Sequence, residues 1–197
     1  TGGMPAVVEA FRVEKDYAEV RRIQSEIVRQ YEGDFGKHID AKTLPRIRMV
    51  WDSIPMQLAK ENKKFFFGQI KKGARSTDFE IAIQWLLDCG LVYKVNRVNE
   101  PHMPLKAYMN MSAYKLFMLD VGLLGALSEL PAETILEGND IFIGFKGALT
   151  EQYVLQQLIS DTDYTPYYYG TDKATFEQDF LIQKERNIVP IEVKAET

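Results

Sequence analysis

The feature that most constrains the fold is a pair of short apolar segments near the end of the chain. Phe-Glu-Gln-Asp-Phe-Leu-Ile at 176–182 and Ile-Val-Pro-Ile-Glu-Val-Lys-Ala at 188–195 are joined by the polar run 184–187. Two such segments around a short polar turn predict a β-hairpin. Side chains alternate along a strand, so Glu192 and Lys194 share one face, and the hairpin sets Asp179 beside them. We therefore predict a sheet face that carries two carboxylates and an ammonium.

A helical segment and an aromatic strand precede this hairpin. The run 144–158 has helical character and carries Glu151, and the strand follows at 166–169. A helix carboxylate close to Asp179 and Glu192 predicts a site for a divalent metal, with Lys194 as the main counter-charge when metal is absent. The alternative from the pattern alone is a plain ion pair, because Glu-x-Lys on one strand face needs no metal.

Three motifs in this half resemble a known family. Phe-Lys-Gly-Ala-x-x-Glu-x-x-Val at 145–154, Glu-x-Asp-Phe-Leu-Ile at 177–182 and Pro-Ile-Glu-Val-Lys at 190–194 are similar to the C-terminal part of a prokaryotic AAA-type ATPase family. Gly-Gly-Met-Pro-Ala-Val at 2–7 and Lys-Leu-Phe-Met-Leu-Asp-Val-Gly-Leu-Leu at 115–124 resemble the same family. That part combines a winged helix with a restriction-endonuclease-like domain of the PD-(D/E)XK pattern.

The resemblance implies roles for four residues. Asp179 and Glu192 would bind Mg²⁺ or Mn²⁺, Lys194 would act on the attacking water or the phosphate, and Glu151 would complete the catalytic cluster. It also implies an ATP-binding P-loop domain upstream and a nuclease-like domain that continues beyond Thr197. No P-loop motif occurs in this sequence, so we expect no ATPase activity from this part.

The upstream half predicts helices followed by a hairpin. Asp16 is the expected N-cap of a helix over 17–31, and a second helix over 47–58 should kink or break at Pro55. A third helix is expected over 79–88 with Gly90 at its end, then a strand at 91–95 that residues 105–109 return, and a helix-like or mixed segment over 111–130. Helix, helix, helix and hairpin is the order of a winged helix.

The predicted fold class is therefore mixed, α+β or α/β. N-terminal helices and a winged-helix-like unit precede a restriction-endonuclease-like mixed sheet flanked by helices. We expect three regions: a helical linker at 1–44, the winged-helix-like domain at 45–110 and the nuclease-like domain at 111–197.

The sequence leaves two alternatives for nucleic-acid binding. The candidate DNA contacts are the cations between the second and third helices: Lys60, Lys63, Lys64, Lys71, Lys72 and Arg75. The third helix carries Asp78, Glu80 and Asp88, which oppose phosphates, and it offers only Gln84 to base edges. Two alternatives follow: weak DNA contact through the flanking lysines, or a winged helix that is structural or docks a protein.

Charge and composition narrow the class of protein. Residues 1–100 hold 17 of the 24 Lys and Arg residues but only 14 of the 28 Asp and Glu residues, and the net charge is −4. The basic excess of the first half permits only local contact with nucleic acid. No apolar run reaches the ~18 residues that a membrane span needs, and the lone Cys89 among apolar neighbours suggests a buried, reduced thiol. We expect a cytoplasmic protein without membrane contact.

Two functions from different classes remain. The first is a metal-dependent nuclease-like domain that acts on nucleic acid for the upstream ATPase. The second is a catalytically inert nuclease-like fold that docks protein partners, including copies of itself, because a fold does not fix a function.

Overall fold

The first half of the chain is mainly helical. Asp16 caps the second helix, since its side chain accepts a hydrogen bond from the Ala18 amide at 2.8 Å, which confirms the predicted N-cap. The helices here are α1 (Pro5–Glu14), α2 (Tyr17–Asp34), α3 (Leu44–Leu58), α4 (Phe67–Ile70) and α5 (Glu80–Asp88), with 3-10 turns η1 (Phe35–Lys37) and η2 (Ser76–Asp78). The computed structural model describes residues 1–37, 39–60, 64–132, 143–170 and 177–195.

One mixed sheet follows the helices and contains every described strand. Its order is β2-β1-β3-β4-β5, with β1 parallel to β3 and the other pairs antiparallel. The strands are β1 (Val92–Val98), β2 (Met109–Met118), β3 (Tyr167–Gly170), β4 (Glu177–Lys184) and β5 (Asn187–Ile191), with η3 (Leu105–Tyr108), α6 (Val121–Leu127) and α8 (Ile143–Asp161) between them. The predicted hairpin is confirmed over Glu177–Ile191, while residue 176 lies outside the described residues and Glu192 and Lys194 follow the end of β5. The mixed α+β fold class is confirmed as well.

The structure corrects the prediction between residues 105 and 130. Residues 105–108 form the 3-10 turn η3, and the strand that returns beside β1 is β2, which begins at Met109. The segment expected as helix-like or mixed over 111–130 is therefore strand to Met118 and helix from Val121. The expected domain boundary between 110 and 111 falls inside β2, so the hairpin β1–β2 belongs to the same sheet as β3–β5.

Other local predictions met different outcomes. Gly90 has a φ of 67° just beyond α5, as a glycine at a helix end should. Pro55 does not break α3, which continues to Leu58. The prediction of a buried thiol is wrong, because Cys89 is exposed.

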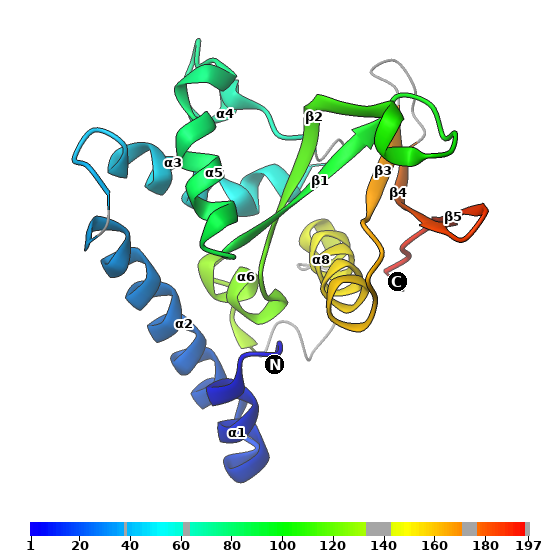
Figure 1. Ribbon diagram of the computed structural model, residues 1–197. Helices are drawn as coiled ribbons and strands as arrows, with labels where there is room; N and C mark the ends of the chain where they lie inside the picture. Colours follow the sequence, from blue (N-terminus) through cyan, green and yellow to red (C-terminus); the bar gives the residue numbers. More distant parts are fainter. Residues whose placement is uncertain (38, 61–63, 133–142, 171–176, 196–197) are drawn as a thin grey trace.

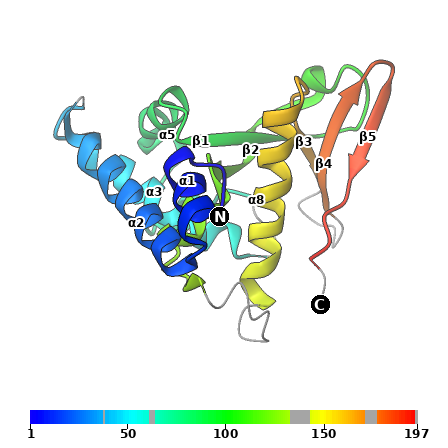
Figure 2. The same ribbon diagram turned by 90° about the horizontal axis from the view of Figure 1, so that it is seen from below.

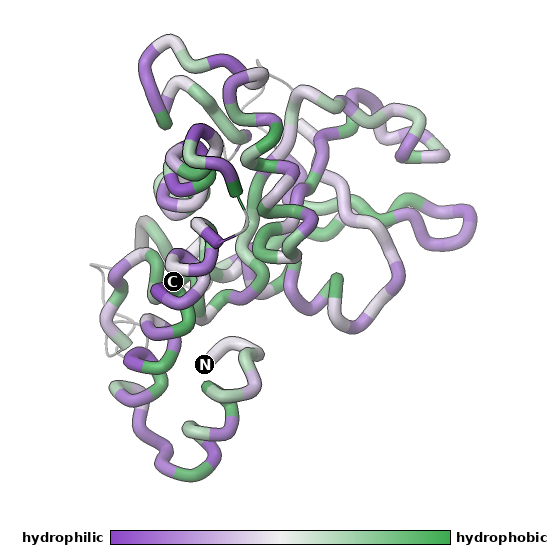
Figure 3. Tube along the Cα trace, turned by 60° about the vertical axis from the view of Figure 1, so that its left-hand side comes forward, coloured by the Kyte–Doolittle hydropathy of each residue, from purple (hydrophilic) through white to green (hydrophobic). Residues whose placement is uncertain are grey.

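Part of the main core lies on the face of the sheet that α8 covers, and β2 is buried on both faces from Ala113 to Met118. In both views α8 lies between the N-terminal helices and the β4–β5 hairpin (Figures 1 and 2). Phe117 of β2 and Phe180 of β4 are fully buried there, with ring centroids 6.0 Å apart. This core continues into α2, α3 and α5, while a smaller cluster around Leu105 and Leu181 lies apart from it. The trace is mostly hydrophobic along the central strands and hydrophilic at the outer turns (Figure 3).

Candidate functional site

The β4–β5 hairpin brings together three of the four predicted site residues. Its register pairs Phe180 with Ile191, so Asp179 and Glu192 follow at neighbouring positions, with Glu192 just past the last residue of β5. Asp179 Oδ2 accepts a hydrogen bond from the Val193 amide at 2.8 Å. Glu192 Oε1 lies 2.6 Å from Lys194 Nζ.

This part of the site lies at the surface. The Lys194 side chain is 80% exposed, and Gln178 Nε2 donates to the second oxygen of Glu192 at 3.2 Å. The hydrogen bond and charge of Glu192, with a smaller effect of Asp179, raise the pKa of the Lys194 ammonium. The ammonium therefore pairs directly with Glu192 and is also affected by the charge of Asp179. We call Asp179, Glu192 and Lys194 the surface cluster.

The fourth predicted residue, Glu151, lies in a different set of contacts. It projects from α8 and is buried, and its Oε2 lies 3.6 Å from Nζ of Lys115 on β2. Lys115 Nζ also lies 2.5 Å from Glu177 Oε1 at the start of β4, and 4.8 Å from the ring centre of Tyr168. We call Lys115, Glu151 and Glu177 the buried cluster.

A pair of hydrogen bonds explains why α8 presents Glu151 to Lys115. The Gln152 side chain accepts from the Met118 amide at 2.9 Å and donates to the Met118 carbonyl at 2.7 Å. Both groups of Gln152 are satisfied inside the protein, as burial requires. This contact fixes the register of α8 against the end of β2. Glu151, one residue before Gln152 on α8, therefore lies near Lys115, three residues before Met118 on β2.

Asp120 continues this joint between β2, α6 and α8. Its Oδ1 accepts from the Leu123 amide at 3.0 Å as the N-cap of α6, and its Oδ2 accepts from the Gly3 amide at 2.6 Å and from Gln156 Nε2 at 3.1 Å. Asp120 is buried, so these bonds offset the cost of removing its charge from water. They serve structure and hold the N-terminal segment against α8.

Sequence reasoning missed Lys115. Its signal is a single charge inside the apolar run Ala-Tyr-Lys-Leu-Phe-Met-Leu at 113–119, and a lysine is almost never fully buried unless it is paired. Lys194 was predicted as the main counter-charge for the carboxylates. The structure assigns that role for Glu151 and Glu177 to Lys115.

A metal ligand set is not evident in the observed geometry. Within the part of the chain that the structure describes, no group of three or more His, Cys, Asp or Glu side chains is placed to hold a metal ion. The metal roles of Asp179 and Glu192 and the catalytic roles of Lys194 and Glu151 remain predictions.

Of the predicted DNA contacts, Lys64 lines a groove formed by the chain after α3, the outer face of α5 and the β1–β2 hairpin. Lys60, Lys71, Lys72 and Arg75 are exposed, Lys64 is half-buried, and Lys63 lies outside the described residues. The groove has a volume of about 890 Å³, and apolar side chains dominate its lining, among them Phe66, Ile81 and Met111. We call it the α5 groove.

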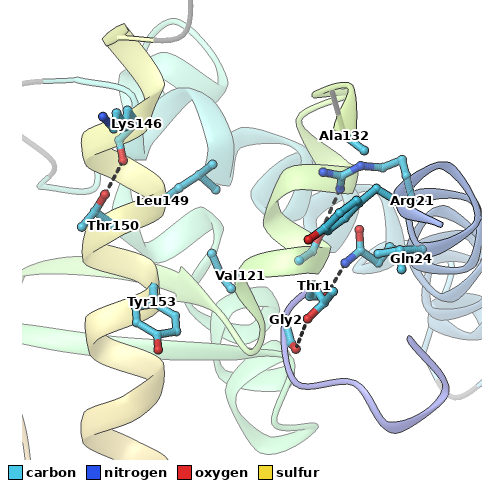
Figure 4. Close-up of a pocket in the computed structure, with 13 residues that line it drawn as sticks. Thr1, Gly2, Arg21, Gln24, Val121, Ala132, Lys146, Leu149, Thr150 and Tyr153 are labelled. Carbon is cyan, nitrogen blue, oxygen red and sulfur yellow. Dashed lines mark hydrogen bonds between the residues drawn. The ribbon is translucent and has the colours of Figure 1, made fainter. Parts of the chain in front are cut away.

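A second, smaller cleft of about 370 Å³ lies where α8 faces α2 and α6 (Figure 4). Arg21 Nη1 donates to the Gly122 carbonyl at 3.0 Å, and Gln24 Nε2 donates to the Thr1 carbonyl at 2.6 Å. On the α8 side, Leu149 and Tyr153 line the cleft. The polar groups at this cleft therefore tie α2 to the N-terminal segment and α6.

Together, the N-terminal helices and the single mixed sheet backed by α8 define an α+β protein whose two halves share a core. The chain belongs to the family described as domain of unknown function DUF8612, which matches residues 1–134. Residues 146–197 match the domain of unknown function DUF4143, a domain often found at the C-terminus of AAA ATPases. No curated protein and no solved structure gives a significant match to the chain. Among the described residues, no helix is long and apolar enough to cross a membrane.

Proposed function

We propose that this protein is a docking module that binds an acidic, apolar segment of a partner protein in the α5 groove. The observation that carries the proposal is the exposure of large apolar side chains in a concave surface. Ile81 on α5 is 71% exposed and Met111 on β2 is 75% exposed, and both line the groove with Phe66. Contiguous exposed apolar surface of this kind is typical of interaction sites.

The charges around the α5 groove select the chemistry of the partner. Lys64 and Lys94 line the groove against the single acid Glu80, and the exposed cations Lys60, Lys71, Lys72 and Arg75 lie on the neighbouring segments. Lys94 Nζ lies 4.3 Å from the ring centre of Tyr114, and burial lowers the pKa of this lysine. A desolvated ammonium beside apolar walls favours a carboxylate that arrives with an apolar neighbour.

The acids on and beside α5 favour protein over DNA as the partner. Asp78, Glu80 and Asp88 lie on or next to this helix, so a phosphate backbone laid along it would meet all three carboxylates, whereas a peptide segment within the groove meets Glu80 as the only lining acid. The match of residues 146–197 to a domain often found at the C-terminus of AAA ATPases suggests the setting: the module would bring protein partners to an ATPase.

Fluorescence polarisation with defined probes tests the proposal. A labelled 12-residue peptide that mixes Glu with Leu and Phe should bind, and versions with Gln for Glu or Ser for Leu and Phe should bind at least about tenfold more weakly. Ile81→Asp and Met111→Asp should each weaken binding of the first peptide. Val13→Asp is the matched control, since Val13 on α1 is 65% exposed and lies outside the groove.

The same assay separates the alternative partner. A 12-base-pair DNA duplex that binds with a steep salt dependence, loses affinity in Lys71→Ala/Lys72→Ala and is insensitive to Ile81→Asp would make the basic segment a nucleic-acid contact and overturn the docking proposal.

The surface cluster supports a second candidate, metal-dependent hydrolysis of phosphodiesters. Asp179 and Glu192 lie side by side on the hairpin, and their charges act together on Lys194. The donors fit Mg²⁺ or Mn²⁺ in kind, since both ions prefer carboxylate oxygens and magnesium binds through as few as one or two carboxylates plus water and phosphate. Such an ion would lower the pKa of a bound water and neutralise charge on the phosphate. The exposed Lys194 would hold a phosphate oxygen or orient the attacking water.

Calorimetric titration with MnCl₂ tests this candidate. Asp179→Asn should abolish the binding heat, while Glu185→Gln at the tip of the same hairpin should leave it unchanged. Binding that survives Asp179→Asn, or no binding by the unaltered protein, removes the candidate.

A further inference from the structure

Lys115 places a buried ammonium at the point where carboxylates from two other elements meet. Its side chain has no exposed surface, and its ammonium lies between carboxylates from two other elements, Glu151 of α8 and Glu177 of β4. The two Nζ–O separations are 3.6 Å and 2.5 Å. The ring face of Tyr168 lies against the same ammonium, 4.8 Å away.

We propose that Lys115 is a built-in substitute for a divalent cation, and that Glu151 and Glu177 form a latent metal site which this lysine keeps closed. The proposal concerns the buried cluster alone and does not depend on the α5 groove or on the surface cluster. It also changes the role predicted for Glu151. The helix carboxylate is present, but the positive charge beside it comes from the Lys115 side chain and not from a bound metal ion.

The enclosure of Lys115 explains how it would keep the site closed. Calcium binds oxygen ligands at about 2.3–2.6 Å in flexible arrangements. The distance from Lys115 Nζ to the Glu177 oxygen, 2.5 Å, already falls in this range, and the distance to the Glu151 oxygen, 3.6 Å, is about 1 Å longer. An ion that entered would have to displace the ammonium. Lys115 is anchored in the middle of β2 and is enclosed on all sides, so its charge cannot move out to water as an exposed lysine can.

Removing the ammonium should therefore open the site. Lys115→Met keeps an unbranched apolar stem of similar length but leaves the carboxylates of Glu151 and Glu177 facing each other without this ammonium. Like charges that share a buried site disfavour ionisation, and a divalent cation relieves the repulsion by binding the folded state only.

Differential scanning fluorimetry with CaCl₂ and MnCl₂ tests the proposal, with NaCl at matched ionic strength as the salt control. Lys115→Met should gain about 5–10 °C in Tm at a metal concentration ~100 times the Kd. The triple variant Lys115→Met/Glu151→Gln/Glu177→Gln should lose that gain. In the unaltered protein, Glu151→Gln/Glu177→Gln should not change the response to metal.

Three results overturn the proposal. The first is a Lys115→Met variant that folds but whose Tm does not respond to either metal beyond the NaCl control. The second is metal binding by the unaltered protein that Glu151→Gln/Glu177→Gln abolishes, since Lys115 would then not exclude the ion. The third applies if Lys115→Met is unfolded without metal: recovery of its circular dichroism with CaCl₂ or MnCl₂ supports the latent site, and failure to recover with either contradicts it.

Discussion

Two lysines in this protein contact glutamates at almost the same distance, yet their surroundings differ completely. Lys194 lies 2.6 Å from Glu192 and is 80% exposed, whereas Lys115 lies 2.5 Å from Glu177 with no exposed surface. Water screens the first pair, and it competes for both partners. The second pair is much less accessible to water, since the Lys115 side chain is fully buried and that of Glu177 is 24% exposed, so its charges interact more strongly. A short N–O distance alone therefore does not tell which pair the fold requires.

The largest expected effect follows from removing the buried ammonium. Lys115→Met should lower the free energy of unfolding by about 3–5 kcal/mol, because it removes the counter-charge from the buried Glu151 and the partly exposed Glu177. Urea unfolding followed by tryptophan fluorescence measures the change. Lys184→Met, at the exposed end of β4, is the matched control and should differ little from the unaltered protein. Equal midpoints for the two variants would show that burial does not distinguish the lysines.

Chemical labelling should separate the two lysines without any mutation. Lys194 should react with an acylating reagent at the rate of an exposed amine, while Lys115 should react at least about 1000-fold more slowly, because it is reached only when the structure opens. Peptide mass spectrometry over a time course gives both rates in one sample. Labelling of Lys115 at a rate close to that of Lys194 would contradict its enclosure.

Removing all charge from the buried cluster should cost less than removing one partner. The triple variant Lys115→Met/Glu151→Gln/Glu177→Gln should lie within about 1–2 kcal/mol of the unaltered protein in urea, since a buried ion pair replaced by neutral groups is often close to neutral in stability. If this variant is as unstable as Lys115→Met, the loss comes from packing around the methionine and not from unpaired charge.

The smallest effect is expected at Lys194. Lys194→Ala should leave the urea midpoint unchanged within error near pH 7, since an exposed pair contributes little. Glu192 raises the pKa of this ammonium in the folded state, so any stabilisation is complete below the unfolded pKa of about 10.4 and is lost as the pH rises through the folded value. A melting series from pH 7 to 11 measures this. A clear drop in Tm for Lys194→Ala at pH 7 would place Lys194 among the required charges.

Local patterns carried the predictions that succeeded. The two apolar segments at 176–182 and 188–195 and the polar turn 184–187 are enough to place β4 and β5, and the Asp16 cap is predicted from its position before an amphipathic run. These features depend on neighbours in the sequence. Physical rules for strands and caps apply directly to them.

The features that were missed depend on contacts between distant residues. Nothing near 92–98 in the sequence indicates that β1 pairs in parallel with β3 some 70 residues later. Lys115 was overlooked for a related reason: its meaning comes from α8 and β4, which lie 36 and 62 positions away in the sequence. The Glu-x-Lys motif at 192–194, by contrast, is visible in the sequence, because Lys194 pairs with Glu192 only two residues away.

The parallel pairing of β1 with β3 determines which fragments of this protein can be produced without an exposed sheet edge. It joins Asn96, Arg97 and Val98 to Tyr167, Tyr168 and Tyr169, and so it covers one long edge of the β3–β5 meander with a strand from the other family segment. A fragment that begins near residue 143 would leave that edge bare, with unpaired amides and carbonyls beside three tyrosines. Bare edges of this kind recruit further strands from other molecules. Such a fragment is expected to aggregate, and an expression clone of the C-terminal segment needs β1 and β2 to remain monodisperse.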